Sequence, residues 1–116
     1  DVERSRGLGD VYKRQIMDYV DAHLHEPLTL DQLAGIAALS TYHFARMFHT
    51  SFGEPPHAWV RGRRLAHARG LLTAGKGDLA GIAQASGFGN ASHLSRVFRD
   101  AIGVTPGQYR NARRPH

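Results

Sequence analysis

The pentapeptide LAGIA occurs twice in this chain, at residues 33–37 and again at residues 79–83. A turn and an arginine-containing amphipathic run follow each copy: FARMF at residues 44–48 after the first, and LSRVF at residues 94–98 after the second. A glycine and a proline then close each run, so that Arg, Phe, Gly and Pro recur 50 residues apart. We therefore expect a tandem repeat of one small helical unit.

The order of elements within each unit is typical of a helix-turn-helix. A helix rich in small residues is followed by a tight turn and then by a helix that carries an arginine. In a helix-turn-helix the second helix enters the major groove of DNA. Two such units in one chain predict contacts with two groove segments.

The composition narrows the function classes. A chain of 116 residues suffices for one domain, or for two very small ones that share a core, and an enzyme with a deep pocket is not expected at this size. The sequence has no Cys, which excludes disulfides, thiolate metal sites and thiol nucleophiles, and it has no apolar run long enough to span a membrane. We expect a cytoplasmic protein without a membrane partner.

The positive charge is concentrated in the repeats. The formal net charge is +5, but residues 32–116 carry 11 Lys or Arg against three acidic residues, Glu54, Asp78 and Asp100. Such a density is the electrostatic footprint of a polyanion partner, although basic surfaces also occur on proteins that bind no nucleic acid. Charge alone leaves both options open.

Apolar spacing and capping signals predict the helices of the first unit. Residues 1–15 show no sustained apolar period, and we interpret them as a disordered lead-in, a linker remnant or sequence foreign to the domain. The first helix is expected over residues 16–25 and is ended by Pro27. A capping box of Thr29 and Gln32 starts the second helix near Leu30.

The remaining helices follow from the same signals. Ser40, Asp78 and Asn90 are expected to cap helices over residues 41–51, from residue 79 through Ser86, and over residues 91–102. A longer helix is expected over residues 56–73, and Thr105-Pro106 starts a short last one. The turn before Asn90 is longer than its counterpart in the first unit. By their spacing, the core aromatic and aliphatic residues of the two units are Phe44, Phe48, Phe88, Leu94 and Phe98.

Residues 16–113 resemble the DNA-binding domain of the AraC/XylS family of bacterial transcription regulators. The matching positions run through the chain in the family's order. In the first unit they are LTL at residues 28–30, Leu39, Ser40, Phe44, Arg46 and Phe48; in the long helix they are Arg64, Leu65, Ala68, Leu71 and Leu72; in the second unit they are Ile82, Ala83, Gly87, Phe88, Ser92, Phe98, Gly103, Pro106 and Tyr109.

The resemblance implies an all-α, homeodomain-like fold of seven helices. A first helix-turn-helix subdomain over residues 16–54 and a second over residues 78–113 are joined by the linker helix over residues 56–73. The third and sixth helices read adjacent major-groove segments, which lie about 34 Å apart on one face of DNA. A linker of about 18 residues spans about 27 Å, so it acts as a ruler between them.

The implied function is sequence-specific binding of double-stranded DNA by a transcription regulator, most often an activator in this family. Contact with RNA polymerase as a second partner is an option that the resemblance leaves open. Relatives commonly carry an N-terminal effector-binding or dimerisation domain, which we expect to lie outside this chain. No cofactor is expected.

Arg46 and Arg96 are the leading candidates for base contacts. They occupy the same place in the two repeats, on the exposed side of their helices by periodicity. A guanidinium fork fits guanine O6 and N7 bidentately, which favours base recognition. The alternatives are that each arginine contacts a phosphate or is a solvated surface residue. The family places further base contacts beside them, at Tyr42 and Ala45 in the first unit and at Ala91, Ser92, His93 and Ser95 in the second. Ala45 and Ala91 offer only a methyl contact.

Phosphate contacts are expected at the helix ends. Backbone N–H groups at a helix N-terminus hold phosphates, and Ser40, Thr41 and Asn90 lie at such ends, although capping alone explains Ser40 and Asn90. Thr105 and Gln108 begin the last helix and raise the same possibility. His49 and Arg99 complete the predicted set of phosphate contacts.

Three rival interpretations remain to be weighed. Eight His residues invite a metal site, but His23 and His25 would point about 200° apart on a helix, and His43 and His49 are not an i, i+4 pair. An enzyme lacks support because residues 75–77 have no strand-to-helix context for a phosphate loop, and because the alkyl-transfer chemistry of some relatives needs an absent Cys. The third rival is a helical protein-interaction module that contacts RNA polymerase or another regulator without specific DNA binding.

Overall fold

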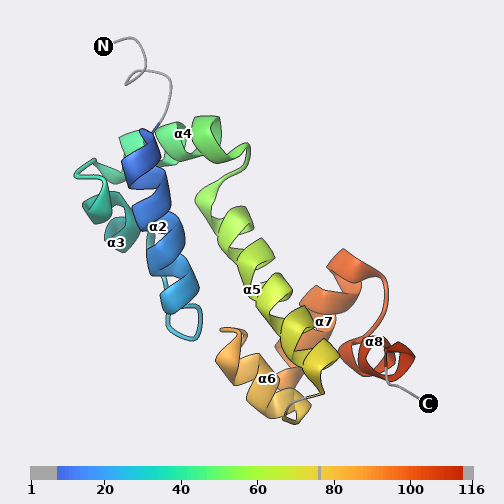
Figure 1. Cartoon of the computed structure of the whole chain (residues 1–116). Helices are drawn as coiled ribbons and strands as arrows, with labels where there is room; N and C mark the ends of the chain where they lie inside the picture. Colours follow the sequence, from blue (N-terminus) through green and yellow to red (C-terminus); the bar gives the residue numbers. More distant parts are fainter. Residues whose placement is uncertain (1–7, 76, 114–116) are drawn as a thin grey trace. The chain divides into compact units, whose positions relative to one another are not determined.

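Seven α-helices make up the part of the chain that the computed structural model describes, residues 8–75 and 77–113. No strand occurs among these residues, so the all-α prediction is confirmed (Figure 1). The chain divides into two compact units, of which the first ends at Gly62 and the second begins at Arg63. The helices are α2 (Asp10–Ala22), α3 (Leu30–Ile36), α4 (Thr41–Phe52), α5 (Pro56–Ala74), α6 (Leu79–Ala85), α7 (Ala91–Ile102) and α8 (Pro106–Ala112). None of them is long and apolar enough to cross a bilayer.

The first unit is built around two phenylalanines of α4. Phe44 and Phe48 are fully buried against α2, α3 and the start of α5. Phe48 stacks on Phe52 with ring centroids 4.0 Å apart, and Trp59 of α5 packs edge-on against Phe52 at 5.0 Å. The other buried members of this core are Ile16, Val20, Leu24, Leu33, Ala34, Ala37 and Val60.

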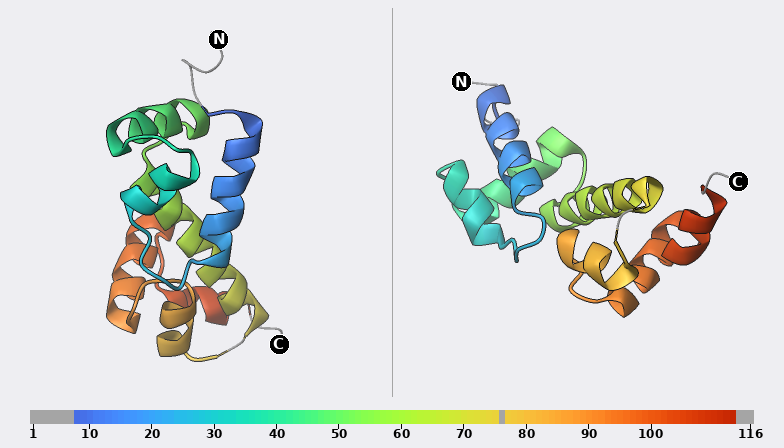
Figure 2. Two further views of the ribbon diagram at one scale, coloured as in Figure 1. Left: turned by 90° about the vertical axis from the view of Figure 1, so that its left-hand side faces the viewer. Right: turned by 60° about the horizontal axis from the view of Figure 1, so that its bottom comes forward.

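The second unit has a separate core, which α6, α7 and α8 form with the C-terminal half of α5 (Figure 2). Leu65, Ala68 and Leu72 of α5 recur at i, i+3 and i+7 and so share one face. Tyr109 of α8 packs edge-on against Phe98 at 5.4 Å. The remaining buried members are Ile82, Ala83, Phe88, Leu94 and Phe98.

Arginines fix α8 in the second unit. The Nη2 group of Arg110 donates to the carbonyl oxygen of Gly77 at 2.8 Å, and Nε of Arg69 donates to the hydroxyl of Tyr109 at 3.4 Å. This hydrogen bond from Arg69 holds the pKa of Tyr109 below its ordinary value. In α5, burial likewise lowers the pKa of Arg64, whose guanidinium remains protonated at neutral pH.

The predicted caps start their helices as expected. The side chains of Ser40, Asp78 and Asn90 each accept the backbone N–H three residues on, at 3.2, 2.8 and 2.8 Å. Thr29 forms the predicted capping box with Gln32, and Thr105 forms another with Gln108. Each cap satisfies a backbone donor that the helix itself leaves without a partner. The starts of five helices are therefore fixed by local sequence.

The start of α2 corrects a prediction. The first helix was expected to begin at residue 16, but α2 begins at Asp10, so residues 10–15 are helical and not disordered. That residues 1–15 are a linker remnant or foreign sequence stays a prediction. The backbone N–H of Leu8 donates to Oγ of Ser51 at 2.6 Å, and Nζ of Lys13 lies 5.2 Å from the ring centroid of Phe52. A cation over an aromatic ring anchors this turn, and apolar periodicity does not detect it. Residues 1–7 lie outside the described residues.

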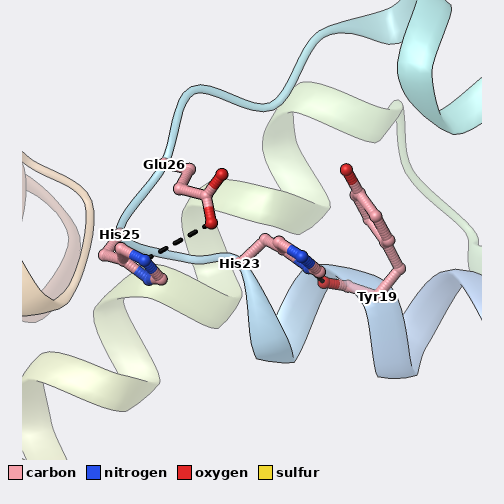
Figure 3. A network of polar contacts seen from close by, with 4 residues as sticks. All are labelled: Tyr19, His23, His25 and Glu26. Carbon is pink, nitrogen blue, oxygen red and sulfur yellow. Dashed lines mark hydrogen bonds and ion pairs between the residues drawn. The ribbon is translucent and has the colours of Figure 1, made fainter.

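The end of α2 also differs from the prediction, because it lies at Ala22 and not at residue 25. Nδ1 of His23 donates to the carbonyl oxygen of Tyr19 at 2.7 Å, and the two rings stack at 4.1 Å (Figure 3). Nε2 of His25 lies 3.4 Å from a carboxylate oxygen of Glu26. The two histidines thus engage different partners. No group of three His, Cys, Asp or Glu that could hold a metal occurs within residues 8–75 and 77–113.

The two LAGIA copies prove not to be structurally equivalent. Ala34 and Ala83 occupy equivalent positions, since Leu39 N–H donates to the Ala34 oxygen at 3.0 Å and Phe88 N–H donates to the Ala83 oxygen at 2.8 Å. The first copy therefore ends α3, whereas the second begins α6. The shift of three residues is close to one helical turn, so the leucine and isoleucine of both copies are buried or half-buried, whereas Ala80 of the second copy is exposed. As predicted, the second turn is longer, with residues 86–90 between helices against residues 37–40.

The equivalent turns contain a matched pair of left-handed residues, Ala38 with φ 55° and Gly87 with φ 88°. An L-residue in this conformation costs about 1–2 kcal/mol, which glycine avoids. We expect Ala38→Gly to raise the free energy of unfolding by about 0.5–1 kcal/mol and Gly87→Ala to lower it by about 1 kcal/mol. Denaturant unfolding would measure both. Ala85→Gly, at an exposed helical position, should destabilise, and the prediction for Ala38 is wrong if it behaves in the same way.

Candidate nucleic-acid interface

Helices α4 and α7 present the same face to solvent. Along residues 41–50 and 91–100 the sequence of buried, half-buried and exposed positions is identical. Phe44 and Phe48 of α4 are buried, as are Leu94 and Phe98 at the equivalent places in α7. The exposed positions that the helices share hold Tyr42, His43, Arg46, His49 and Thr50 in α4, and Ser92, His93, Arg96, Arg99 and Asp100 in α7. The structural repeat therefore extends to the predicted contact residues.

On α4 the exposed face carries an aromatic–cation pair. Tyr42 is 66% exposed, and the guanidinium carbon of Arg46 lies 5.7 Å from its ring centroid. The two residues stand four apart, which places them one above the other on the helix surface. Tyr42 and Arg46 were predicted as two separate base contacts, but in the structure they form one aromatic–cation pair. Their i, i+4 spacing was the signal for it in the sequence.

On α7 the equivalent arginine is held differently. Nη2 of Arg96 lies 3.3 Å from Nδ1 of His93, and the His93 ring packs against Phe88 with centroids 5.7 Å apart. Both residues are exposed, so solvent or a ligand reaches the guanidinium. His93, predicted as a base contact, turns one side of its ring toward its own unit.

A shallow open hollow on the second unit gathers six of the predicted contact residues. It extends from α7 to the start of α8, and no acidic side chain lines it. Three hydroxyl groups and two guanidinium groups surround it, together with one methyl group. The lining residues are Ala91, Ser92, Ser95, Arg96, Arg99 and Thr105.

The chemistry of this hollow suits an anionic, hydrogen-bonding ligand. Hydroxyl and guanidinium donors are the groups that proteins use on phosphate oxygens, and a guanidinium also reads the acceptors of guanine. Thr105 caps α8, which follows α7 after Gly103 in the left-handed conformation. Helical periodicity does not indicate that α7 and the cap residue of α8 border one hollow.

Of the other predicted contacts, all but Ala45 lie at helix ends. Oγ of Ser40, Oδ1 of Asn90 and Oε1 of Gln108 each accept a backbone N–H in a cap. Thr41 is half-buried in the first turn of α4, Ala45 is half-buried one turn on, and His49 is exposed in the last turn. Capping thus accounts for these three side-chain oxygens, and phosphate contact at the helix ends stays a prediction.

Comparisons with known proteins identify the family of this chain. The profile of a family described as "Helix-turn-helix domain" matches residues 33–112, which is more than half of the chain. The regulatory protein PocR of Salmonella typhimurium is 37% identical over 101 residues, which cover 87% of this chain and 33% of PocR. The chain spans between 14% and 38% of the length of the first curated relatives that it matches. Those relatives are named as transcriptional regulators or regulatory proteins, not as enzymes.

Solved structures share the fold. The DNA-binding domain of AdpA, a global transcriptional factor crystallised in complex with a target DNA, has a TM-score of 0.80 and 29% identity, with 85% of this chain and 89% of that chain covered. An AraC-type transcriptional regulator from Chromobacterium violaceum has a TM-score of 0.80 and 27% identity, with 88% and 91% covered. The family match and these neighbours confirm the resemblance read from the sequence: the chain belongs to the AraC-type helix-turn-helix family of transcription regulators.

Proposed function

We propose that this chain binds double-stranded DNA sequence-specifically, as part of a bacterial transcription regulator, by inserting α4 and α7 into adjacent major-groove segments. The observation that carries the proposal is the placement of Arg46 and Arg96 at equivalent exposed positions of two helices with the same burial pattern. The AdpA domain, which has this fold, was crystallised with a target DNA. Such a regulator acts in the cytoplasm, where bacterial DNA lies.

The contacts divide into those that read bases and those that hold phosphates. Side chains in the middle of the exposed face reach base edges, whereas side chains and N–H groups at the helix ends meet the backbone. The proposed base contacts are Tyr42, Ala45, Arg46, Ala91, Ser92, His93, Ser95 and Arg96. The proposed phosphate contacts are Ser40, Thr41, His49, Asn90, Arg99, Thr105 and Gln108.

The whole regulator is proposed to contain more than a DNA-binding domain. Relatives are between about two and a half and seven times as long as the matched segment, as the covered shares of 38% and 14% require. An effector-binding domain outside residues 1–116, and contact with RNA polymerase during activation, therefore belong to the proposal for the whole protein.

Salt dependence provides the first test. Residues 32–116 carry 11 basic against three acidic residues, so binding should release condensed counterions. If about six of these basic side chains neutralise phosphates, the affinity for a labelled duplex should fall by about 10³ between 50 and 200 mM salt. Fluorescence anisotropy would measure it on the intact chain. A fall of less than about tenfold would instead favour a protein-interaction module.

A further inference from the structure

The two equivalent arginines are held by different side chains. Arg46 lies over the ring of Tyr42, whereas position 92 of the second unit is a serine, which offers no ring. Arg96 instead directs Nη2 toward Nδ1 of His93 at 3.3 Å. The orientation of each guanidinium therefore depends on a different chemistry.

The histidine that lies about one helical turn before each arginine also has a different partner in each unit. In α4, Nδ1 of His43 lies 3.4 Å from Oγ of the Ser40 cap. In α7 the cap is Asn90, whose Oδ1 accepts the backbone N–H of His93 at 2.8 Å, and the His93 ring lies against Phe88 and Arg96. A histidine thus contacts the cap residue in the first unit and Arg96 in the second.

We propose that His93 is a positioning residue that holds Arg96 for base reading, so that base selection by the second unit requires a neutral histidine while selection by the first does not. The inference rests on the proposed function and assigns the division of work within that site. His93 acts through Arg96, and the Nε2 side of the His93 ring faces the DNA.

The hydrogen bond specifies the protonation state. A guanidinium can only donate, so Nδ1 of His93 must carry a lone pair, and the neutral ring then bears its proton on Nε2. Protonation would turn Nδ1 into a donor and place a like charge beside Arg96. Arg96 is the charged group in contact with the ring among the described residues, since Phe88 from the turn after α6 and the Asn90 cap are uncharged.

Acid should therefore move specificity and affinity in opposite directions. Losing the hydrogen bond loosens Arg96 and weakens its choice of base, but the added charge on His93 strengthens attraction to phosphates. Histidine side chains ordinarily change charge between about pH 5 and 8. The face of a tyrosine ring attracts a guanidinium throughout that range, so the base read by Arg46 should be insensitive to pH.

The test measures base discrimination, defined as the affinity for the preferred base pair divided by the mean affinity for the other three. The base pair read by Arg96 is first identified as the one at which Arg96→Ala abolishes discrimination. In the parent chain, discrimination there should fall by about fivefold from pH 8 to pH 5.5, as expected for loss of one hydrogen bond. Discrimination at the base pair read by Arg46 should not change.

Variants at position 93 test whether His93 acts by offering Arg96 a hydrogen-bond acceptor. His93→Asn keeps an acceptor near the place of Nδ1 that cannot be protonated, so discrimination should stay high at both pH values. His93→Ala lacks the acceptor, and discrimination should be low at both. The Asn90 cap uses the backbone N–H of residue 93 and survives both changes. His43→Ala, at the equivalent position of α4, is the matched control and should retain the parent's pH response at the Arg96 base pair.

The outcomes distinguish this inference from the proposed function. If Arg96 reads a base pair but discrimination there is the same at both pH values, or the same in His93→Ala as in the parent, His93 does not position Arg96. If no base pair depends on Arg96, the base-reading role of Arg96 fails and this inference fails with it. Thermal melting at both pH values confirms that each variant is folded.

Discussion

Replacing Arg96 with alanine is expected to relax base preference at one position of the DNA site, and replacing Arg46 should relax it at another, about one helical turn away. Each change should cost about 1–3 kcal/mol of binding free energy against the preferred site, because a bidentate arginine–guanine pair contributes that much discrimination. Both side chains are exposed on equivalent positions of α4 and α7, so neither truncation removes a core contact. Affinities for a panel of single-base-pair variants of the site would measure the effect.

The pattern of loss identifies the kind of contact. A base contact loses affinity for the preferred sequence only, whereas a phosphate contact weakens all sequences equally and lowers the slope of the salt dependence. Arg61→Ala, an exposed arginine of α5 outside the proposed contacts, is the matched control and should change affinity little. If Arg46→Ala or Arg96→Ala weakens every sequence to the same extent, that arginine holds a phosphate.

Local signals predicted most of the fold. Caps at Thr29, Ser40, Asp78, Asn90 and Thr105 are short-range hydrogen bonds between residues three apart, so the sequence alone carries the information. The same holds for Gly53 and Gly103, whose left-handed conformation ends α4 and α7. The recognition faces followed from periodicity, which fixes the side of a helix that a residue occupies.

Features that depend on contacts between distant segments were not predicted. The start of α2 depends on Leu8 meeting Ser51 and on Lys13 meeting Phe52, which are about 40 residues away in the sequence. The hollow between α7 and α8 requires the packing of Tyr109 on Phe98, a tertiary contact.

Inserting two alanines between Arg63 and Arg64 of α5 should abolish joint binding of a two-segment site. The insertion adds about 3 Å and turns one end of the helix against the other by about 200°. It falls between Val60, which belongs to the first core, and Leu65, which belongs to the second, so each unit keeps its own core residues. Affinity for the two-segment site should drop by about 10² or more, to that of the better single segment, because linked binding is lost.

Controls separate the helical phase of α5 from its stability. Circular dichroism and thermal melting must show that both units still fold, and each single-segment duplex should bind the insertion variant as it binds the parent. Gly62→Ala adds a Cβ that meets no neighbour and leaves the length of α5 unchanged, so two-segment affinity should be maintained. A four-alanine insertion turns the helix by only about 40° and should lose less affinity than the two-alanine insertion.

The dependence of two-segment affinity on the helical phase of the insertion distinguishes a rigid linker helix from a flexible connection. A flexible connection would tolerate both insertions, since its effective concentration changes little with a few residues. A continuous helix that holds α4 and α7 to one side of the DNA would tolerate the larger insertion better than the smaller one. If the folded two-alanine variant binds the two-segment site as tightly as the parent, the two units do not read DNA jointly through α5. One unit would then carry recognition, and the other would serve as its structural partner.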